Sequence, residues 1–361
     1  MRANAARATF AALAAVLGYC GPAAADCAPM TRIASLDLQA AIDKKEEYVP
    51  VTINGVSKLM LLDTGGAMTE ITTEAADELH LSRRQGNFRL YNIYGESSDT
   101  FAEASLAIGP LKADRVALAI APGRYVFGED FELAGVLAPD ILKHYDIDVD
   151  FGSDKLSLFS PDHCEGKVIY WKTDTVAVVP MRVLHSGHIM VSVLLDGQPV
   201  IAILDTGAWH TTLSVPVAES QFGLKLGSAQ APQTGNLTGK PNAYVYRHVF
   251  QTLAFEGIVV QNPQVEIIPD LLHQVAADAA APVTGTRIGD PRKLESAASM
   301  LIGMNILRHF HIYIAYKEQR LYVTPTVEYP VLPPIADTPA QAVPAHLTER
   351  LDALTPRNSL R

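Results

Sequence analysis

Two aspartates at equivalent points of a repeated motif are the residues of this chain best suited to chemistry. Residues 62–65 have the sequence Leu-Asp-Thr-Gly, and residues 204–207 repeat it 142 positions later. Each copy follows an apolar run without polar alternation, which is typical of a strand buried on both faces. Asp63 and Asp205 are therefore predicted to stand where buried strands end. A carboxylate in that position costs free energy unless it is paired, so two of them indicate a functional pair.

Two carboxyl groups held close together share one proton, because like charges at short range do not both ionise. The ionised member takes a proton from water while the other donates a proton to a carbonyl oxygen. This is general acid-base hydrolysis of an amide, with no covalent intermediate. Hydroxyl and backbone N–H groups of the two motifs are predicted to hold the carboxylates in plane, and the glycines allow a tight turn. These supporting residues are Thr64, Gly65, Thr206 and Gly207.

Elements of the same kind surround each motif. Asn54-Gly55 and Asp196-Gly197 separate apolar runs and predict a β-hairpin whose second strand delivers each aspartate. A second hairpin follows each motif, with a glycine at its tip: Gly95 in the first copy and Gly235 in the second, 140 positions apart. The order of elements is therefore the same in both halves.

A later landmark is also duplicated, at a larger offset. An apolar-apolar-small segment ends at Ala138 in the first half and at Gly303 in the second, 165 positions on. An insertion of about residues 271–298 in the second copy accounts for the difference. Two copies of one β-rich unit are the simplest interpretation.

Length and charge limit the classes of function. A chain of 361 residues is predicted to form two domains. Its composition, 48% hydrophobic and 19% charged, is that of a globular protein. The formal net charge of -10, without a run of Lys or Arg, argues against nucleic acid or an anionic membrane surface as partner.

The first residues have the pattern of a targeting segment. A basic start, a short apolar run and Ala23-Ala24-Ala25 predict a secretory signal peptide over residues 1–25, and hence a periplasmic or secreted protein. No integral membrane span is expected after its removal. One alternative is a retained membrane anchor. Another is a lipoprotein anchor at Cys20, although Tyr19 stands where such signals have a small residue.

Two cysteines remain after the signal peptide, Cys27 and Cys164. In an oxidising compartment a disulfide between them would close the chain of the first half into a loop. The alternative is two free thiols. Two cysteines without a set of partner histidines are not expected to form a metal site.

The two motifs in context resemble those of the aspartic proteases, of the bacterial secreted or periplasmic retropepsin-like type more than pepsin. Residues 61–67 read Leu-Leu-Asp-Thr-Gly-Gly-Ala and residues 203–208 read Ile-Leu-Asp-Thr-Gly-Ala. The resemblance covers about residues 45–160 and 185–325. It implies an all-β fold with short helices, in which two homologous acid-protease lobes enclose the active site in the cleft between them. The lobes are assigned to residues 26–165 and 166–325, and a Pro-rich tail to residues 326–361.

The resemblance also implies roles for particular residues. Asp63 and Asp205 become the catalytic pair of an endopeptidase acting on polypeptide substrates, without metal or cofactor. Tyr94 and Gly95 correspond to a flap over the substrate, and Gly235 to the matching tip in the second half. Because both halves lie in one chain, a monomer is sufficient for the site.

Three positions depart from the family pattern. Ala138 replaces the glycine that Gly303 supplies in the second half, which predicts crowding beneath the first catalytic loop. Gly66 and Ala208 follow the motifs where pepsin-like enzymes have Ser or Thr. Loss of that hydroxyl would leave the carboxylate pKa less depressed, so activity nearer neutral pH is expected. Ala138 is also the one feature favouring the alternative function, a peptide-binding module without catalysis. Trp209-His210, just beyond the second motif, is interpreted as part of the rim rather than as catalytic.

Overall fold

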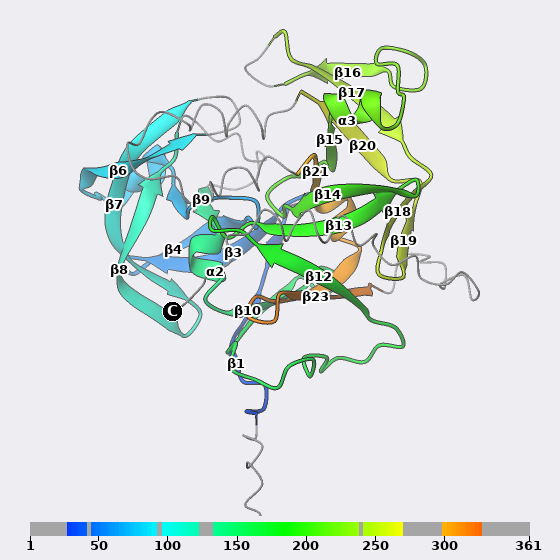
Figure 1. Ribbon diagram of the computed structural model, residues 1–361. Coiled ribbons are helices and arrows are strands. Elements are labelled where there is room, and N and C mark those ends of the chain that lie inside the picture. Colours follow the sequence, from blue (N-terminus) through cyan, green and yellow to red (C-terminus); the bar gives the residue numbers. More distant parts are fainter. Residues whose placement is uncertain are drawn as a thin grey trace, which may run out of the picture.

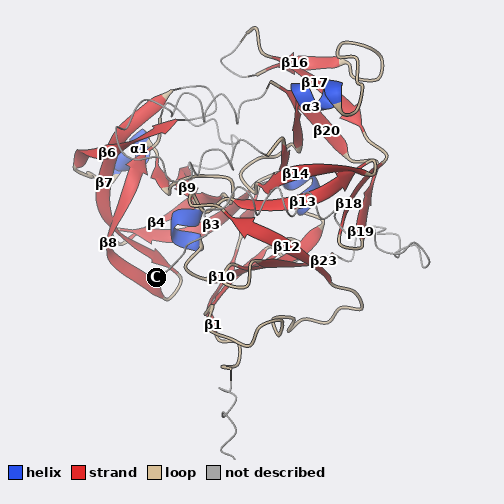
Figure 2. Cartoon of the chain, viewed as in Figure 1, coloured by secondary structure: helices blue, strands red, loops and turns tan. Residues whose placement is uncertain are grey.

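The structure, a computed structural model, describes residues 27–41, 45–91, 96–122, 133–237, 241–269 and 298–326. The predicted signal peptide, nearly all of the insertion and the tail beyond residue 326 lie outside these ranges. So do the predicted flap residues Tyr94 and Gly95. The described chain is mostly β-strand with a few short helices, and it forms two lobes on either side of shared strands (Figures 1 and 2). The predicted fold class is confirmed.

Among the described residues, the first lobe is built on an eight-stranded sheet. The strands follow one another in the order β2 (Gln39–Ala40), β3 (Glu47–Ile53), β4 (Val56–Leu62), β9 (Leu133–Leu137), β5 (Glu70–Ile71), β8 (Leu111–Ile120), β7 (Ser97–Ile108) and β6 (Arg83–Tyr91). The turn at Asn54-Gly55 joins β3 to β4, with both residues at positive φ, as the hairpin signal predicts.

The second lobe repeats this order strand for strand. Its strands are β12 (Ala177–Val183), β13 (Ile189–Leu195), β14 (Gln198–Leu204), β21 (Met300–Ile302), β15 (Thr212–Ser214), β20 (Gln264–Ile268), β17 (Tyr244–Val249) and β16 (Gln233–Asn236). A further hairpin of β18 (Thr252–Phe255) and β19 (Ile258–Gln261) pairs with β13. Strands β4 and β9 are parallel, as are β14 and β21. The prediction of two copies of one unit is therefore confirmed.

A central sheet joins the lobes. It runs β1 (Arg32–Asp37), β11 (Lys155–Phe159), β10 (Asp146–Asp150), β22 (Phe310–Ala315), β23 (Arg320–Pro325) and then β12. Strands β10 and β22 pair antiparallel, with Asp148 opposite Tyr313. Because these two residues are equivalent in the two copies, 165 positions apart, the pseudo-two-fold axis of the chain passes through this pair.

The two faces of the central sheet differ in composition. Alternation along β10 and β22 sends Ile147, Val149, Ile312 and Ile314 into a hydrophobic core that includes side chains of both lobes. The opposite face carries buried polar side chains, which the segment of residues 160–176 covers. One continuous apolar core therefore fixes the lobes relative to each other.

The helices are short. In the described part of the chain they are α1 (Thr73–Glu78), α2 (Pro139–Leu142), α3 (Val215–Ser220) and α6 (Met304–Leu307). The hydroxyl of Thr72 caps α1 by accepting from the N–H of Ala75 at 3.1 Å, in agreement with the predicted threonine cap. Helices α2 and α6 each follow the apolar-apolar-small segment of their own lobe. No helix in the described ranges is both long and apolar enough to cross a membrane.

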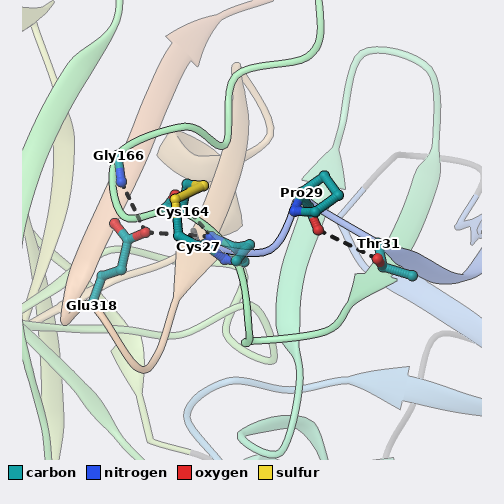
Figure 3. The surroundings of a disulfide bond; sticks show 7 residues. Cys27, Pro29, Thr31, Cys164, Gly166 and Glu318 are labelled. Atoms are coloured by element: carbon teal, nitrogen blue, oxygen red, sulfur yellow. Dashed lines mark hydrogen bonds and ion pairs between the residues drawn. A yellow bond between two sulfur atoms is a disulfide. The ribbon is translucent and has the colours of Figure 1, made fainter. Parts of the chain in front are cut away.

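Cys27 and Cys164 form a disulfide, with their Cα atoms 4.9 Å apart (Figure 3). The N–H of Cys164 also donates to the carbonyl of Ala28 at 2.9 Å. Nearby, the N–H of Gly166 donates to Glu318 in the β22–β23 turn at 3.0 Å. The predicted pairing is confirmed, and the bond fastens the beginning of the described chain to the segment that connects the lobes.

Candidate active site

The two motif aspartates stand at equivalent ends of parallel strand pairs. The N–H of Asp63, directly after β4, donates to the carbonyl of Leu137 at the end of β9, at 3.1 Å. The N–H of Asp205, directly after β14, donates to Ile302 at the end of β21, at 3.0 Å. Each aspartate is thus held where two buried strands finish, as the apolar runs before the motifs predict.

The threonines of the motifs fasten the two loops to each other. The hydroxyl of Thr64 donates to the carbonyl of Leu204 at 2.9 Å and accepts from the N–H of Thr206 at 3.1 Å. The hydroxyl of Thr206 donates to the carbonyl of Leu62 at 2.7 Å and accepts from the N–H of Thr64 at 3.0 Å. Both threonines are buried, so these four bonds are shielded from water and fix the distance between the loops.

The glycines allow each loop to pass close to the carboxyl group of the other. A Cβ on Gly65 would lie 2.3 Å from Cγ of Asp205, and one on Gly207 would lie 2.4 Å from Cγ of Asp63. Each glycine N–H also donates to the aspartate of its own motif, at 2.8 Å for Gly65 and 3.0 Å for Gly207. The N–H of Ala208 adds a second bond to Asp205, at 3.1 Å. The two carboxyl groups therefore face each other in one small, oriented site.

Burial and proximity perturb both carboxyl groups. Burial raises the pKa of Asp63 above the ordinary aspartate value, although the N–H of Gly65 and a hydrogen bond with Asp205 lower it. Burial also raises the pKa of Asp205, and the neighbouring charge of Asp63 raises it further. The pair consequently retains a proton to higher pH than two isolated aspartates would.

An equivalent hydrogen-bond network supports each Asp-Thr-Gly loop. In the first lobe the hydroxyl of Thr69 accepts from the N–H of Ala138 at 3.1 Å and donates to Asp140 at 2.6 Å. In the second lobe the hydroxyl of Thr211 accepts from the N–H of Gly303 at 3.1 Å and donates to the side chain of Asn305 at 2.7 Å. The sequence analysis identified Ala138 and Gly303 but missed their partners Thr69, Asp140, Thr211 and Asn305.

The constant offsets between the two copies in the sequence could have identified this network. Thr211 follows Thr69 by 142 positions, the offset of the catalytic motifs. Asn305 follows Asp140 by 165 positions, the offset of Ala138 and Gly303.

Ala138 fits beneath the first loop because its neighbour is a glycine. A Cβ on Gly66 would lie 3.2 Å from the Cβ of Ala138. In the second lobe the small residue is Gly303, where a Cβ would lie 2.7 Å from the carbonyl oxygen of Ala208. The first lobe thus has Ala138 next to a glycine, whereas in the second lobe Gly303 itself lies against the backbone of Ala208 and His210. Because Gly66 has no side chain, that residue does not crowd the methyl group of Ala138.

Substitution of Gly65 by Ala is expected to disrupt the pair of carboxyl groups. The new methyl group would force the side chain of Asp205 to move. A displacement of a reacting group by about 1 Å lowers the reaction rate on the order of 10²-fold. The measurement is peptide hydrolysis, with thermal melting to show that the variant folds. Val56→Ala, an exposed residue at the start of β4, serves as control and should leave the rate unchanged. Equal rates for Gly65→Ala and the natural protein would contradict the close approach.

Other predicted site residues are not part of this constellation. Gly235 lies on β16, the outermost strand of its sheet, and a Cβ there would meet open space. Trp209 and His210 are partly exposed beside the second loop, consistent with a rim position. Within the described ranges, no group of three or more His, Cys, Asp or Glu side chains is placed to hold a metal ion.

Comparisons with known proteins point to one family. A family model described as aspartyl protease matches residues 49–138 and 191–306. Among solved structures, the chain is similar to an aspartic proteinase from Irpex lacteus, at 13% identity and a TM-score of 0.44, covering 81% of this chain and 97% of that one. It is also similar to basic 7S globulin from soybean, at 12% identity and a TM-score of 0.43, with 82% and 95% covered. No curated protein matches the chain.

Proposed function

Because this chain belongs to the aspartyl protease family, whose model matches both of its lobes, we propose that it is an aspartic-type endopeptidase. Asp63 and Asp205 are its catalytic pair. The observation that carries the proposal is the geometry of these carboxyl groups: they face each other from two interlocked loops, and the glycine of each loop lies against the aspartate of the other. A turn aspartate without a catalytic role has no need of this arrangement.

The proposed reaction uses one shared proton. The ionised carboxylate takes a proton from a water molecule, whose oxygen adds to the carbonyl carbon of the peptide bond. The protonated carboxyl group donates its proton to the carbonyl oxygen, which gives a tetrahedral diol. Collapse of the diol breaks the C–N bond and returns a proton to the leaving amine. The N–H groups of Gly65, Gly207 and Ala208 keep the carboxylates oriented throughout.

The test of the proposal is hydrolysis of an unstructured protein by the purified chain. We expect new amino termini to be released and the release to be inhibited by pepstatin. No hydrolysis at any acidic or neutral pH, by protein shown to be folded, would refute it. In that case the second candidate, a peptide-binding module, would be left. Ala138 is the sequence feature that favours this candidate, and Gly66, which has no side chain, leaves room for its methyl group.

The pH-rate profile is expected to extend towards neutrality. The active pair carries one proton, so activity falls on the acid side when a second proton binds and on the alkaline side when the shared proton is lost. Burial raises the pKa of both aspartates, and the charge of Asp63 raises that of Asp205 further, so both limbs move to higher pH. The measurement is kcat/KM against pH. Activity that vanishes well below neutrality would contradict the predicted shift.

The site and the disulfide are relevant to the oligomeric state and the cellular location of the protein. Both carboxyl groups come from one chain, so a monomer is sufficient for catalysis, and the substrate is a polypeptide. The disulfide between Cys27 and Cys164 fits an oxidising compartment, and we propose a periplasmic or secreted location on this basis and on the predicted signal peptide.

A further inference from the structure

The turn between β12 and β13, residues 184–188, belongs to the second lobe but contacts the first lobe. We refer to it as the β12–β13 turn. Gly187 is buried in it at a φ of +96°, and a Cβ there would lie 2.5 Å from the Cβ of Pro139, the first residue of α2. The ammonium group of Lys143, just after α2, donates to the carbonyl of His185 at 3.4 Å. The turn of one lobe is therefore packed on a helix of the other (Figure 1).

The start of this helix leads directly to the first catalytic loop. Pro139 follows Ala138, whose Cβ lies 3.2 Å from the position that a Cβ on Gly66 would occupy. The same position is 2.9 Å from Oδ2 of Asp63. A short series of contacts thus connects the β12–β13 turn of the second lobe to the catalytic carboxyl group of the first.

His188 is the last residue of the β12–β13 turn, and its side chain is half-buried. Its carbonyl accepts from the N–H of Leu184 at 2.9 Å, and its Nδ1 lies 3.1 Å from the hydroxyl oxygen of Ser186. These contacts give the imidazole a defined place at the boundary of the lobes. Burial is the largest influence on the pKa of Asp63 and raises it, and the charge of protonated His188 is among the influences that lower it.

Other charged groups lie on the elements that meet at this turn. Among the described residues of α2, β12 and the turn itself they are Asp140, Lys143, Arg182 and His185. Histidine is the type of side chain whose charge changes between about pH 5 and 8. The side chain of His185 is exposed, so water and salt screen its charge. His188 is therefore the group of this boundary through which pH can change the electrostatic field at Asp63.

The two halves of the pair differ in their electrostatic surroundings. Glu46 stands 142 positions before His188, the offset of the catalytic motifs, and its carboxylate accepts from the hydroxyl of Tyr48. The equivalent residue of the first lobe is thus an acid. Burial raises the pKa of Asp205 and the charge of Asp63 raises it further, whereas for Asp63 the charge of His188 opposes the effect of burial.

We propose that His188 is a positioning residue of the catalytic pair: as the imidazolium it favours the ionised form of Asp63, so that the shared proton lies on Asp205. This inference rests on the proposed function and assigns the two roles within it, with Asp63 as general base and Asp205 as general acid. The imidazolium also opposes the binding of a second proton to the pair, so it extends activity to lower pH. On the alkaline side the imidazole is neutral and has little effect.

The first test is the pH profile of kcat/KM for His188→Gln. Because the variant lacks the positive charge, we expect the acid limb to move to higher pH, by on the order of half a pH unit or more, and the alkaline limb to stay in place. His188→Lys keeps a positive charge. It should leave the acid limb near its natural position and draw the alkaline limb to lower pH.

The control is His185→Gln, because His185 lies in the same turn with an exposed side chain and contacts Lys143 through its backbone carbonyl. Its profile should match that of the natural protein. Thermal melting shows that each variant is folded. A merely structural role of His188 would lower the rate by the same factor at every pH. The inference is overturned if the acid limb of His188→Gln does not move, or if His188→Lys moves it equally.

A second test needs no substrate, so the two proposals fail in distinguishable ways. Carbon-13 NMR of the chain with labelled aspartate side chains follows the titration of the pair, and Asp63→Asn and Asp205→Asn assign the two signals. We expect Asp63 to ionise at lower pH than Asp205, and His188→Gln to raise the pH at which it does so. If no peptide is cleaved but this shift is found, the enzymatic function fails and the role of His188 in the pair stands. An unchanged titration in His188→Gln would overturn that role even in an active enzyme.

Discussion

Replacement of Asp205 by Asn is expected to lower the rate of peptide hydrolysis by about 10²–10⁴-fold, which is the usual contribution of a general acid or base to the rate. An amide holds no titratable proton and cannot exchange one with Asp63. Asp63→Asn should have an effect of the same size, since either substitution leaves a single carboxyl group. The measurement is kcat/KM on an unstructured substrate, at the pH optimum of the natural protein.

The loss should not come from unfolding. Burial and the charge of Asp63 both raise the pKa of Asp205, so its ionised form is unfavourable in the folded protein. A neutral amide removes that cost, and the melting temperature of Asp205→Asn should equal or exceed that of the natural protein. Asp37→Asn is the control, because the side chain of Asp37 is 85% exposed in a surface ion pair. Hydrolysis that survives in Asp63→Asn or Asp205→Asn would refute the shared-proton mechanism.

A large loss of stability is expected from a substitution on the polar face of the central sheet, the face opposite the apolar core. Asp146 on β10 is fully buried, and Nε2 of His163 lies 2.6 Å from its carboxylate. The N–H of Tyr316 donates to the same side chain at 3.2 Å. His163→Ala would leave a buried carboxylate without its charged partner, which typically costs about 3–5 kcal/mol of unfolding free energy. Urea denaturation measures the change.

A neighbouring residue provides the matched control. Asp162 precedes His163, but it forms an exposed ion pair with Lys317 at 2.6 Å, and the side chains are 78% and 64% exposed. Asp162→Ala, a change at an exposed surface position, should leave the unfolding free energy essentially unchanged. If both substitutions shift the urea midpoint equally, the Asp146–His163 pair has no special role.

The contribution of this pair should depend on pH in a defined direction. Burial by itself would lower the pKa of His163, but its hydrogen bond to Asp146 and the charge of that group outweigh burial and raise it. Burial raises the pKa of Asp146 as well, so the pair keeps a proton. A raised histidine pKa stabilises the fold fully below the pKa of free histidine and loses this effect as pH rises through the folded value. The difference between the natural protein and His163→Ala should therefore shrink at alkaline pH.

A second buried pair lies beside the first on the same face. Asp148 accepts from the hydroxyl of Tyr170, and Nε2 of His311 lies 2.6 Å from its carboxylate. The ring of Trp171 stacks on His311 with the ring centres 4.0 Å apart, and its indole N–H donates to Thr324 at 3.1 Å. The segment of residues 160–176 thus covers the polar face of the central sheet with polar and aromatic contacts.

Much of the architecture of this protein could be predicted from its amino-acid sequence. Apolar strands ending at Asp63 and Asp205, constant offsets between repeated landmarks, and hairpin signals at Asn54-Gly55 and Asp196-Gly197 were sufficient for a two-lobed β fold and a candidate pair of carboxylates. A buried strand and a tight turn each leave a pattern within a few residues, and the duplication is visible because the same short patterns recur at constant offsets. The two cysteines were equally informative, since with Cys20 assigned to the signal peptide each had only one partner.

The contacts by which the two halves support each other could not be predicted from the sequence. The contact of Ala138 with Gly66, and that of Gly303 with the backbone of Ala208, are approaches of a few ångströms between segments far apart in the chain. The same is true of Thr69 with Asp140, of the Asp146–His163 pair and of Gly187 against Pro139. A threonine, a buried aspartate or a turn glycine carries no local mark of its partner, because the partner is chosen by packing across the pseudo-two-fold axis. The Asp-Thr-Gly motif was therefore predictable from its own residues, whereas the contacts that hold it belong to the folded chain.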